Sequence, residues 1–235
     1  MFASIHPTTE HLFFSSDMSL SLLRSTDQGE TWDPIANPIP GTAYYVAGDP
    51  KEPYTLYMNQ QGETTRASGI WKSTDNGETW MQIYQSEEFG ISRSQSGVVD
   101  PDNNEVIYWT AADMGVKRSN NGGKSWEDVS LGLPKEKIKH NYYHCHALEI
   151  DHNSLVDERL IYYPTNLGLY RMQEPDSTWE LIKELPQCTC IDVEVCDGDV
   201  IYVAFHDHGL FRSIDGGKTF FKSRKDWMVK SLLVS

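Results

Sequence analysis

The stretch from Arg24 to Trp32, RSTDQGETW, decides the fold because the chain repeats it. Close copies follow as KSTDNGETW at 72–80, RSNNGGKSW at 118–126 and RSIDGGKTF at 212–220, and a decayed copy, YRMQEPDSTW, ends at 179. The closing aromatic residues stand at 32, 80, 126, 179 and 220, so successive copies are 48, 46, 53 and 41 residues apart. A period of about 45 residues is typical of repeat architectures in which each unit packs against its neighbours.

The residues of the repeated stretch predict a stapled turn. A short Asp side chain accepts hydrogen bonds from the backbone N–H groups that follow it, Gly adopts positive φ, and Ser or Thr hydroxyls satisfy the remaining donors. The closing aromatic residue is expected to pack inward from the next strand. A structural role is therefore predicted for Asp27, Trp32, Asp75, Trp80, Asn121, Trp126, Trp179, Asp215 and Phe220. The alternative is a calcium or substrate site at Asp27, Asp75 and Asp215.

Four strands are expected in each period. The second run of each unit is β-branched or aromatic without a helical period, and these runs read HLFFSS, TLYMNQ, VIYWTA, LIYYPT and VIYVAF. Four strands per unit make a propeller blade. The sequence predicts an all-β propeller of four-stranded antiparallel blades, about five in this chain, at 1–40, 41–92, 93–140, 141–187 and 188–225. The segment 227–235 is expected to be the first strand of a further blade, which favours part of a larger propeller over five blades with a spare strand.

The pattern SxDxGxTW at 25–32 and 73–80 resembles the Asp-box (BNR) repeat. That repeat is found in sialidases, xyloglucanase-like glycosidases, sortilin-type receptors and a photosystem assembly factor. The resemblance covers almost the whole chain and implies a propeller. Because those relatives differ in activity, it implies no single function. In a propeller the boxes lie on the outer rim, and the loops around the innermost strands form the opposite face, where binding is expected.

Composition excludes several partners. The 235 residues include 34 acidic and 20 basic side chains, and a net charge of −14 would repel nucleic acid and an anionic membrane surface. No apolar run approaches the ~18 residues of a membrane span, and MFASIHP does not resemble a signal peptide. If the protein is extracellular or periplasmic, we expect its signal to have been removed. The four cysteines, Cys145, Cys188, Cys190 and Cys196, are too few for a fold built on disulfides.

Histidine and tyrosine gather in the loops predicted to surround the channel of the fourth and fifth blades. The segment KHNYYHCHALEID contains His140, Tyr142, Tyr143, His144 and His146, and FHDHG contains His206, Asp207 and His208. These residues are predicted to bind a glycan or a protein segment. With Cys188 and Cys190 nearby, the candidates for a zinc or copper site are His144, His146, His206 and His208. No spacing matches a known zinc module, so we expect no cofactor, and water-satisfied polar residues are the simpler interpretation.

Two carboxylates are candidates for catalysis. Asp17 in SSDMSL and Asp113 in AADMG occupy corresponding loops of the first and third predicted blades. Both resemble the AspXxxGly loop of xyloglucanase-like glycosidases, which implies acid/base catalysis. Glycoside hydrolysis needs two carboxyl groups about 5–10 Å apart, one of them protonated. In that family the pair comes from two propellers facing one cleft, so an enzyme would need a region outside this chain.

The sialidase alternative is disfavoured because the sequence lacks the ArgIlePro signature of those enzymes. Outside the box positions, the arginines left to clamp a sugar carboxylate are Arg66, Arg93, Arg159 and Arg224. The sequence therefore favours a rigid platform that binds a glycan or a protein segment, and the alternative is a xyloglucanase-like glycoside hydrolase. Further blades of a larger protein or an oligomer are also expected partners.

Overall fold

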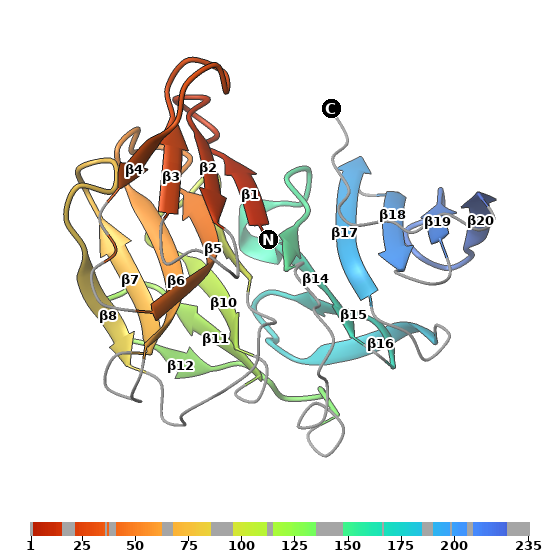
Figure 1. The fold of residues 1–235 in the computed structure, drawn as a ribbon. Helices are drawn as coiled ribbons and strands as arrows, with labels where there is room; N and C mark the ends of the chain where they lie inside the picture. The colour runs from red at the N-terminus through yellow and green to blue at the C-terminus, as the bar shows by residue number, and fades with distance from the viewer. Residues whose placement is uncertain are drawn as a thin grey trace. The chain divides into compact units, whose positions relative to one another are not determined.

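A computed structural model describes residues 2–15, 22–35, 37, 41–62, 68–85, 96–111, 115–134, 148–165, 167–184, 190–197, 199–205 and 209–224. These residues form five four-stranded sheets, and in each sheet the strands lie in sequence order (Figure 1). The pairings determined for the first, second, fourth and fifth sheets are all antiparallel. The predicted all-β fold of five four-stranded blades is confirmed. The segment 227–235 lies outside the described residues.

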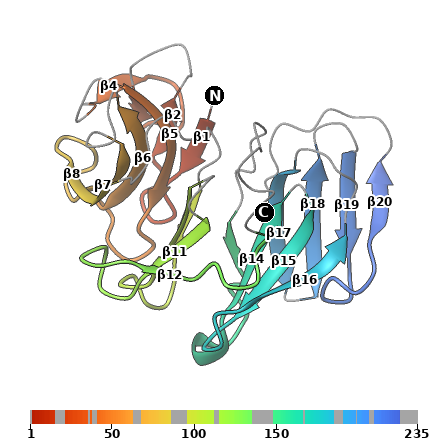
Figure 2. The same cartoon turned by 90° about the horizontal axis from the view of Figure 1, so that it is seen from below.

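The strands of the first two sheets are β1 (Phe2–Ile5), β2 (Leu12–Ser15), β3 (Leu22–Ser25), β4 (Asp33–Ile35), β5 (Gly41–Gly48), β6 (Leu56–Gly62), β7 (Gly69–Ser73) and β8 (Met81–Gln85). The third sheet contains β9 (Gly97–Val99), β10 (Ile107–Ala111), β11 (Gly115–Ser119) and β12 (Glu127–Asp128). The last two sheets contain β13 (Glu149–Ile150), β14 (Leu160–Thr165), β15 (Gly168–Gln173), β16 (Trp179–Glu184), β17 (Cys190–Asp197), β18 (Val200–Phe205), β19 (Gly209–Ser213) and β20 (Phe221–Arg224). Figure 2 shows β17, β18, β19 and β20 side by side in one sheet.

A short 3-10 helix, Val156–Glu158, lies between β13 and β14. Among the described residues, no helix is long and apolar enough to cross a membrane.

The chain divides into two compact units. The first comprises residues 1–91, 99–108 and 118–127, and the second comprises residues 92–98, 109–117 and 128–235. In the first unit, Phe13, Leu22 and Ile35 form one apolar cluster with Leu56 and Met58 of the next sheet. In the second unit, Tyr162 and Leu169 pack with Val193, Ile201 and Val203. Each cluster joins two successive sheets, as expected where a blade buries its face against its neighbour.

The second strands were predicted from their β-branched and aromatic composition, and burial explains that composition. In β6, the side chains of Leu56, Tyr57 and Met58 are all buried, although alternate residues of a strand point to opposite faces. In β14, Ile161 and Tyr162 are buried in the same way. A strand that is covered on both faces needs a continuous apolar run rather than an alternating one.

An isoleucine on the fourth strand of one sheet packs against a glycine in the next sheet's box turn. A Cβ added to Gly77 would stand 2.6 Å from the Cδ1 atom of Ile35. The same construction at Gly123 meets Ile83 at 2.5 Å, and at Gly217 it meets Ile182 at 2.8 Å. Each isoleucine follows its own box aromatic by three positions. One side-chain contact is thus repeated at three junctions between successive sheets.

Candidate functional site

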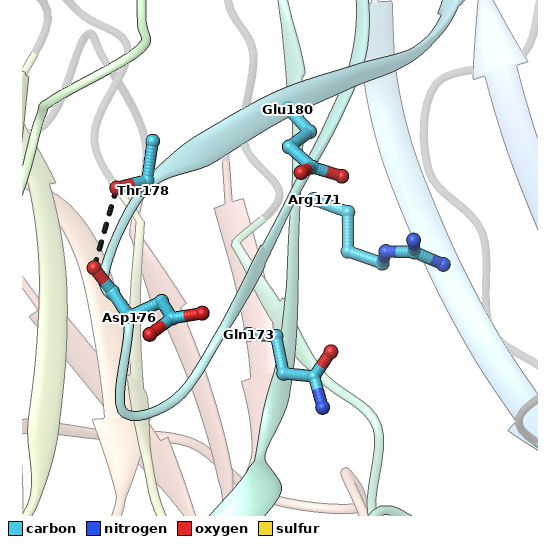
Figure 3. A pocket seen from close by; sticks show the side chains of 5 residues that line it. All are labelled: Arg171, Gln173, Asp176, Thr178 and Glu180. Atoms are coloured by element: carbon cyan, nitrogen blue, oxygen red, sulfur yellow. Dashed lines mark hydrogen bonds between the residues drawn. The ribbon is translucent and has the colours of Figure 1, made fainter.

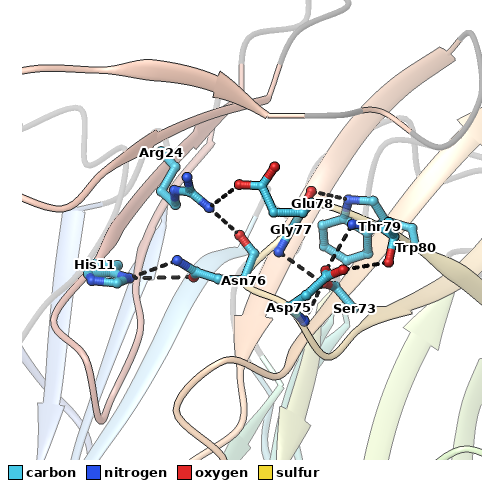
Figure 4. Close-up of polar contacts among 9 residues, drawn as sticks. All are labelled: His11, Arg24, Ser73, Asp75, Asn76, Gly77, Glu78, Thr79 and Trp80. Atoms are coloured by element: carbon cyan, nitrogen blue, oxygen red, sulfur yellow. Dashed lines mark hydrogen bonds and ion pairs between the residues drawn. The ribbon is translucent and has the colours of Figure 1, made fainter.

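The box of the second sheet shows how the repeated turn is held (Figure 4). One carboxylate oxygen of Asp75 accepts hydrogen bonds from the Thr79 N–H at 2.8 Å and the Ser73 hydroxyl at 2.8 Å. The other accepts the Thr79 hydroxyl at 2.6 Å. The Ser73 hydroxyl oxygen in turn accepts the Gly77 N–H at 2.9 Å. These hydrogen bonds are those that the sequence predicts, and Gly77 has the expected positive φ of 92°.

The boxes at Asp27 and Asp215 repeat this geometry. Their carboxylates accept the backbone N–H of Thr31 and of Thr219, each at 2.9 Å, and the hydroxyl of the same threonine. The hydroxyl hydrogen bond is the main cause that lowers the pKa of each aspartate from 3.8 to about 2. Both carboxylate oxygens in each box therefore accept hydrogen bonds from the aspartate's own turn, which fits a structural role better than a ligand site.

The box at Asn121 keeps this pattern without a charge. Its side-chain oxygen accepts the Ser125 N–H at 2.9 Å, and its amide donates to the Ser125 hydroxyl at 2.8 Å. No group of three or more His, Cys, Asp or Glu side chains in the described ranges is placed to hold a metal ion.

The box aromatics pack between successive sheets rather than wholly inward. The indole N–H of Trp126 donates to the Gly123 carbonyl of its own turn and to the Ile83 carbonyl of the preceding sheet, each at 3.2 Å. Trp179 is buried and donates to the Val129 carbonyl at 2.7 Å. Trp32 instead remains 38% exposed. The expectation of an inward tryptophan therefore needs correction for Trp32. Among the described residues, a Cβ added to Gly29 of this box meets only Leu12 and Trp32, and no isoleucine of another sheet as at Gly77.

The basic residue before the box reaches across to the neighbouring blade in the first two sheets. The Arg24 guanidinium donates to the Asn76 carbonyl of the next sheet at 2.7 Å and lies 3.1 Å from Glu78 (Figure 4). Lys72 donates in the same way to the Gly122 carbonyl at 3.3 Å. Both side chains are partly buried because they cross to the neighbouring blade.

A second repeated turn lies between the first and second strands of the sheets. Buried Asp49 accepts the N–H groups of Lys51 and Glu52, each at 2.9 Å, and buried Asp100 and Asp151 accept N–H groups from the turns that follow them. His6 occupies this place in the first sheet. The sequence signal is an Asp-Pro pair in the second and third units, whereas the first unit reads His-Pro and the fourth reads Asp-His.

His6 satisfies its turn with a neutral ring. Its Nδ1 atom accepts the N–H groups of Thr8 at 3.1 Å and Thr9 at 3.3 Å. Its Nε2 atom lies 3.3 Å from the Thr55 carbonyl, so the ring hydrogen belongs on Nε2. Burial lowers the pKa of His6 below its ordinary value.

Among the described residues, each unit carries a surface groove. The first, here called the lysine groove, has a volume of about 630 Å³ and is lined by Lys72, Trp80, Met81, Ile83 and Lys124, together with threonines, a glutamine and glycines. The second has a volume of about 280 Å³ and follows β15, β16 and their connecting turn (Figure 3). It is lined by Arg171, Gln173, Asp176, Thr178 and Glu180, so both signs of charge are present.

All of the predicted glycan-binding and catalytic residues lie outside the described residues. These are Asp17, Asp113, His140, Tyr142, Tyr143, His144, His146, His206, Asp207 and His208. Of the two cysteines proposed for a metal site, Cys188 lies outside as well, and Cys190 begins β17. Their assignment remains a prediction from the sequence.

Comparison with known proteins agrees with this architecture. The family model for the BNR/Asp-box repeat matches residues 23–34. The chain is 26% identical over 260 aligned positions to the xyloglucanase Xgh74A of Acetivibrio thermocellus, a match that covers 88% of this chain and 29% of that protein. The chain thus spans about three-tenths of the length of this relative.

Solved structures show the same fold at low sequence identity. The GH74 xyloglucanase of Xanthomonas campestris superposes with a TM-score of 0.64 and 17% identity over 93% of this chain and 37% of its own. YCF48 bound to D1 peptide superposes with a TM-score of 0.54 and 16% identity over 91% of this chain and 64% of its own. With five four-stranded blades and the repeated aspartate turn in place, the chain is a β-propeller of the BNR/Asp-box type that resembles xyloglucanases and is related to glycoside hydrolases.

Proposed function

We propose that the propeller is a rigid platform that binds a β-glucan, with xyloglucan as the glycan to test first. The observation that carries the proposal is the match to xyloglucanases, which runs along 88% of this chain rather than along the box motifs alone. A match of that extent goes beyond the repeated turn, and the binding residues of a propeller are expected in the loops between its strands. Such a polymer does not cross membranes, so the proposal places the protein outside the cell or in the periplasm.

The proposed binding residues are those of the histidine- and tyrosine-rich loops. Tyr142 and Tyr143 offer flat apolar rings with a polar edge, and His144, His206 and Asp207 offer hydrogen-bond donors and acceptors. The box aspartates are unsuited to this role because their own turns occupy them. Both oxygens of Asp75, for example, accept hydrogen bonds from Ser73 or Thr79. A binding surface therefore has to come from residues outside the repeat.

Affinity electrophoresis of the purified chain tests this proposal. Migration should be retarded in a gel that contains xyloglucan and unchanged in a gel that contains mannan. Replacing Tyr143 and His144 together by alanine should abolish the retardation, whereas Asp215→Asn, a box variant, should keep it. If the unaltered chain migrates equally in both gels, the proposal fails. If a protein segment is bound instead, the glycan proposal fails as well.

A catalytic role is the second candidate, favoured by the names of the relatives. Asp17 and Asp113 would act as the acid and the base, completed by a region outside this chain. Release of reducing ends from xyloglucan, lost in both Asp17→Asn and Asp113→Asn, would establish it. Binding without any such release by the natural full-length protein would exclude it. Metal analysis of protein prepared without chelators tests the zinc or copper alternative, since a bound ion should be lost in the variant His144→Ala with His146→Ala.

A further inference from the structure

Because the box is repeated, equivalent residues can be compared at two successive junctions between blades. At the first junction, Arg24 precedes its box and reaches the Asn76 carbonyl in the next box. The guanidinium also pairs with the carboxylate of Glu78, the residue after Gly77, at 3.1 Å. The basic side chain, whose exposed fraction is 16%, therefore has an anionic partner supplied by the next repeat.

At the second junction the basic residue is kept and the carboxylate is lost. Lys72 takes the place of Arg24 and reaches the Gly122 carbonyl at 3.3 Å. The residue after Gly123, in the place of Glu78, is Lys124. The carboxylate of the first junction is thus replaced by a second cation. Burial and the charge of Lys124 both lower the pKa of Lys72, opposed by Asp49, Glu52 and Glu105.

The two lysines stand in the lysine groove, and none of the described residues that line it is acidic. That is unusual in a chain with 34 acidic and 20 basic residues. Asp49, Glu52 and Glu105 act on Lys72 from outside the lining. One wall is apolar, formed by Trp80, Ile83 and Met81, whose exposed fraction is 64%. The groove therefore combines positive charge with an apolar surface.

We propose that the lysine groove binds an acidic peptide segment, whose carboxylate lies between Lys72 and Lys124 and whose neighbouring apolar side chain contacts Met81 and Trp80. The carboxylate would restore the ion pair that Arg24 and Glu78 form at the first junction. Charge complementarity supports this occupant, because an anionic ligand meets two cations and no carboxylate among the described residues of the lining. The exposed methionine favours a peptide over a sugar, since flexible thioethers are typical of surfaces that receive apolar side chains.

None of the residues that line the lysine groove belongs to the proposed glycan-binding set, so the two proposals can be tested independently. The probe is a rhodamine-labelled peptide of alternating glutamate and leucine with blocked ends, followed by fluorescence anisotropy. A peptide with glutamine in place of glutamate is the matched probe. The acidic peptide should bind and the glutamine peptide should bind at least about tenfold more weakly. Amide shifts in NMR spectra should centre on Gly122 and Gly123.

Lys124→Glu is the decisive variant because it rebuilds the carboxylate of the first junction next to Lys72. It should lower affinity for the acidic peptide at least about tenfold. Lys218→Glu is the matched control, since Lys218 holds the same box position in the fifth sheet. This substitution changes the net charge by the same amount as Lys124→Glu. It should leave affinity unchanged, and both variants should show the unaltered melting temperature within a few degrees. Met81→Ser should weaken binding without any change in charge.

Several outcomes would overturn the proposal. Equal affinity for the glutamate and glutamine peptides would show that no carboxylate of the peptide is recognised. Equal loss in Lys124→Glu and Lys218→Glu would show attraction to the whole molecule rather than to the groove. Binding of oligogalacturonate at this site without binding of the peptide would identify a carbohydrate surface instead.

Discussion

At the scale of single residues, the box aspartate stabilises its turn as a hydrogen-bond acceptor, and its negative charge is secondary. Asp75 accepts the Thr79 N–H, the Thr79 hydroxyl and the Ser73 hydroxyl, whereas Asn121 accepts two of the three equivalent donors and reverses the third bond. The same turn is therefore built with and without a carboxylate. Charge is dispensable at neutral pH provided that the acceptor remains.

We therefore expect Asp75→Asn to be tolerated and Asp75→Ala to destabilise. Loss of the acceptor leaves turn donors without a partner, as in the loss of a helix cap, and should cost about 1 kcal/mol of the free energy of unfolding. The asparagine variant should cost less than half of that. Urea denaturation at pH 7 measures both. Equal destabilisation by the two variants would show that charge, and not acceptance, holds the turn.

Acid should weaken the box turns in a defined range. The pKa values of Asp27 and Asp215 fall from 3.8 to about 2 on folding, so the unfolded chain binds protons more readily. Stability is fully present above the ordinary pKa and is lost as pH falls toward about 2. The urea midpoint should fall between about pH 5 and pH 2.5, and the variant Asp27→Asn with Asp215→Asn should show a smaller fall. If the urea midpoint of this variant fell as much as that of the unaltered chain, other carboxyl groups would explain the acid sensitivity.

His6 should add a pH dependence at a higher range. Burial lowers its pKa below 6.5, with His11 acting in the same direction and Asp49 opposing it. A histidine that is neutral when folded stabilises fully above its unfolded pKa, and this stability is lost as pH falls below that value. Protonation of Nδ1 would also oppose the N–H groups of Thr8 and Thr9.

His6→Asn is the variant that isolates this effect, since an amide oxygen can accept the same N–H groups without titrating. The difference in urea midpoint between about pH 7.5 and pH 5.5 should be smaller in His6→Asn than in the unaltered chain. His152→Asn serves as the control, because His152 is exposed and lies in a turn of another sheet. An undiminished difference in His6→Asn would exclude His6 as the titrating group.

At the scale of elements, a contact between an isoleucine and a glycine recurs at three junctions between successive sheets. Gly77 and Gly29 have the same φ of 92°, so any side chain is equally strained at both. Only Gly77 has an isoleucine at 2.6 Å from an added Cβ, whereas the nearest atom to Gly29 is Leu12 Cδ1 at 3.4 Å. The pair therefore separates backbone strain from packing.

Gly77→Ala should destabilise more than Gly29→Ala, by about 1–3 kcal/mol, because the added methyl group overlaps Ile35. In a background of Ile35→Ala the difference should largely disappear, while Ile35→Ala alone should cost about 2–4 kcal/mol for the cavity that it leaves. Urea denaturation of the unaltered chain, the three single variants and the two double variants completes the cycle. If the difference persists without Ile35, strain within the turn explains it instead.

The elements within a blade could be predicted from sequence, and the contacts between blades could not. The run TLYMNQ predicted a strand because its composition and period are local properties, and it falls in β6. Ile35 and Gly77 are 42 positions apart, and only the packing of two sheets shows that they meet. The proposed role of Lys124 could not be predicted for the same reason. It follows from a comparison with Glu78, and only the structure shows that Glu78 pairs with Arg24. His140 to His146 lie outside the described residues, so that part of the candidate site stays a prediction.

At the scale of the whole molecule, the net charge of −14 and the local charge of the lysine groove have opposite consequences. Excess negative charge destabilises the compact state through self-repulsion, and salt screens it. Attraction of an acidic peptide to Lys72 and Lys124 is screened by the same ions. The Debye length falls from about 10 Å at 0.1 M to about 3 Å at 1 M, so both effects respond in an accessible range.

Raising NaCl from about 0.05 M to 0.5 M should therefore stabilise the fold and weaken peptide binding at the same time. The urea midpoint should rise, and the affinity for the glutamate peptide should fall several-fold. Lys124→Glu provides the internal control: its urea midpoint should respond to salt as the unaltered chain does, while its residual peptide binding should show little dependence. If salt raised both the urea midpoint and the peptide affinity, the proposed attraction to the groove would be contradicted. Screening of the net negative charge of the whole molecule would then explain both changes.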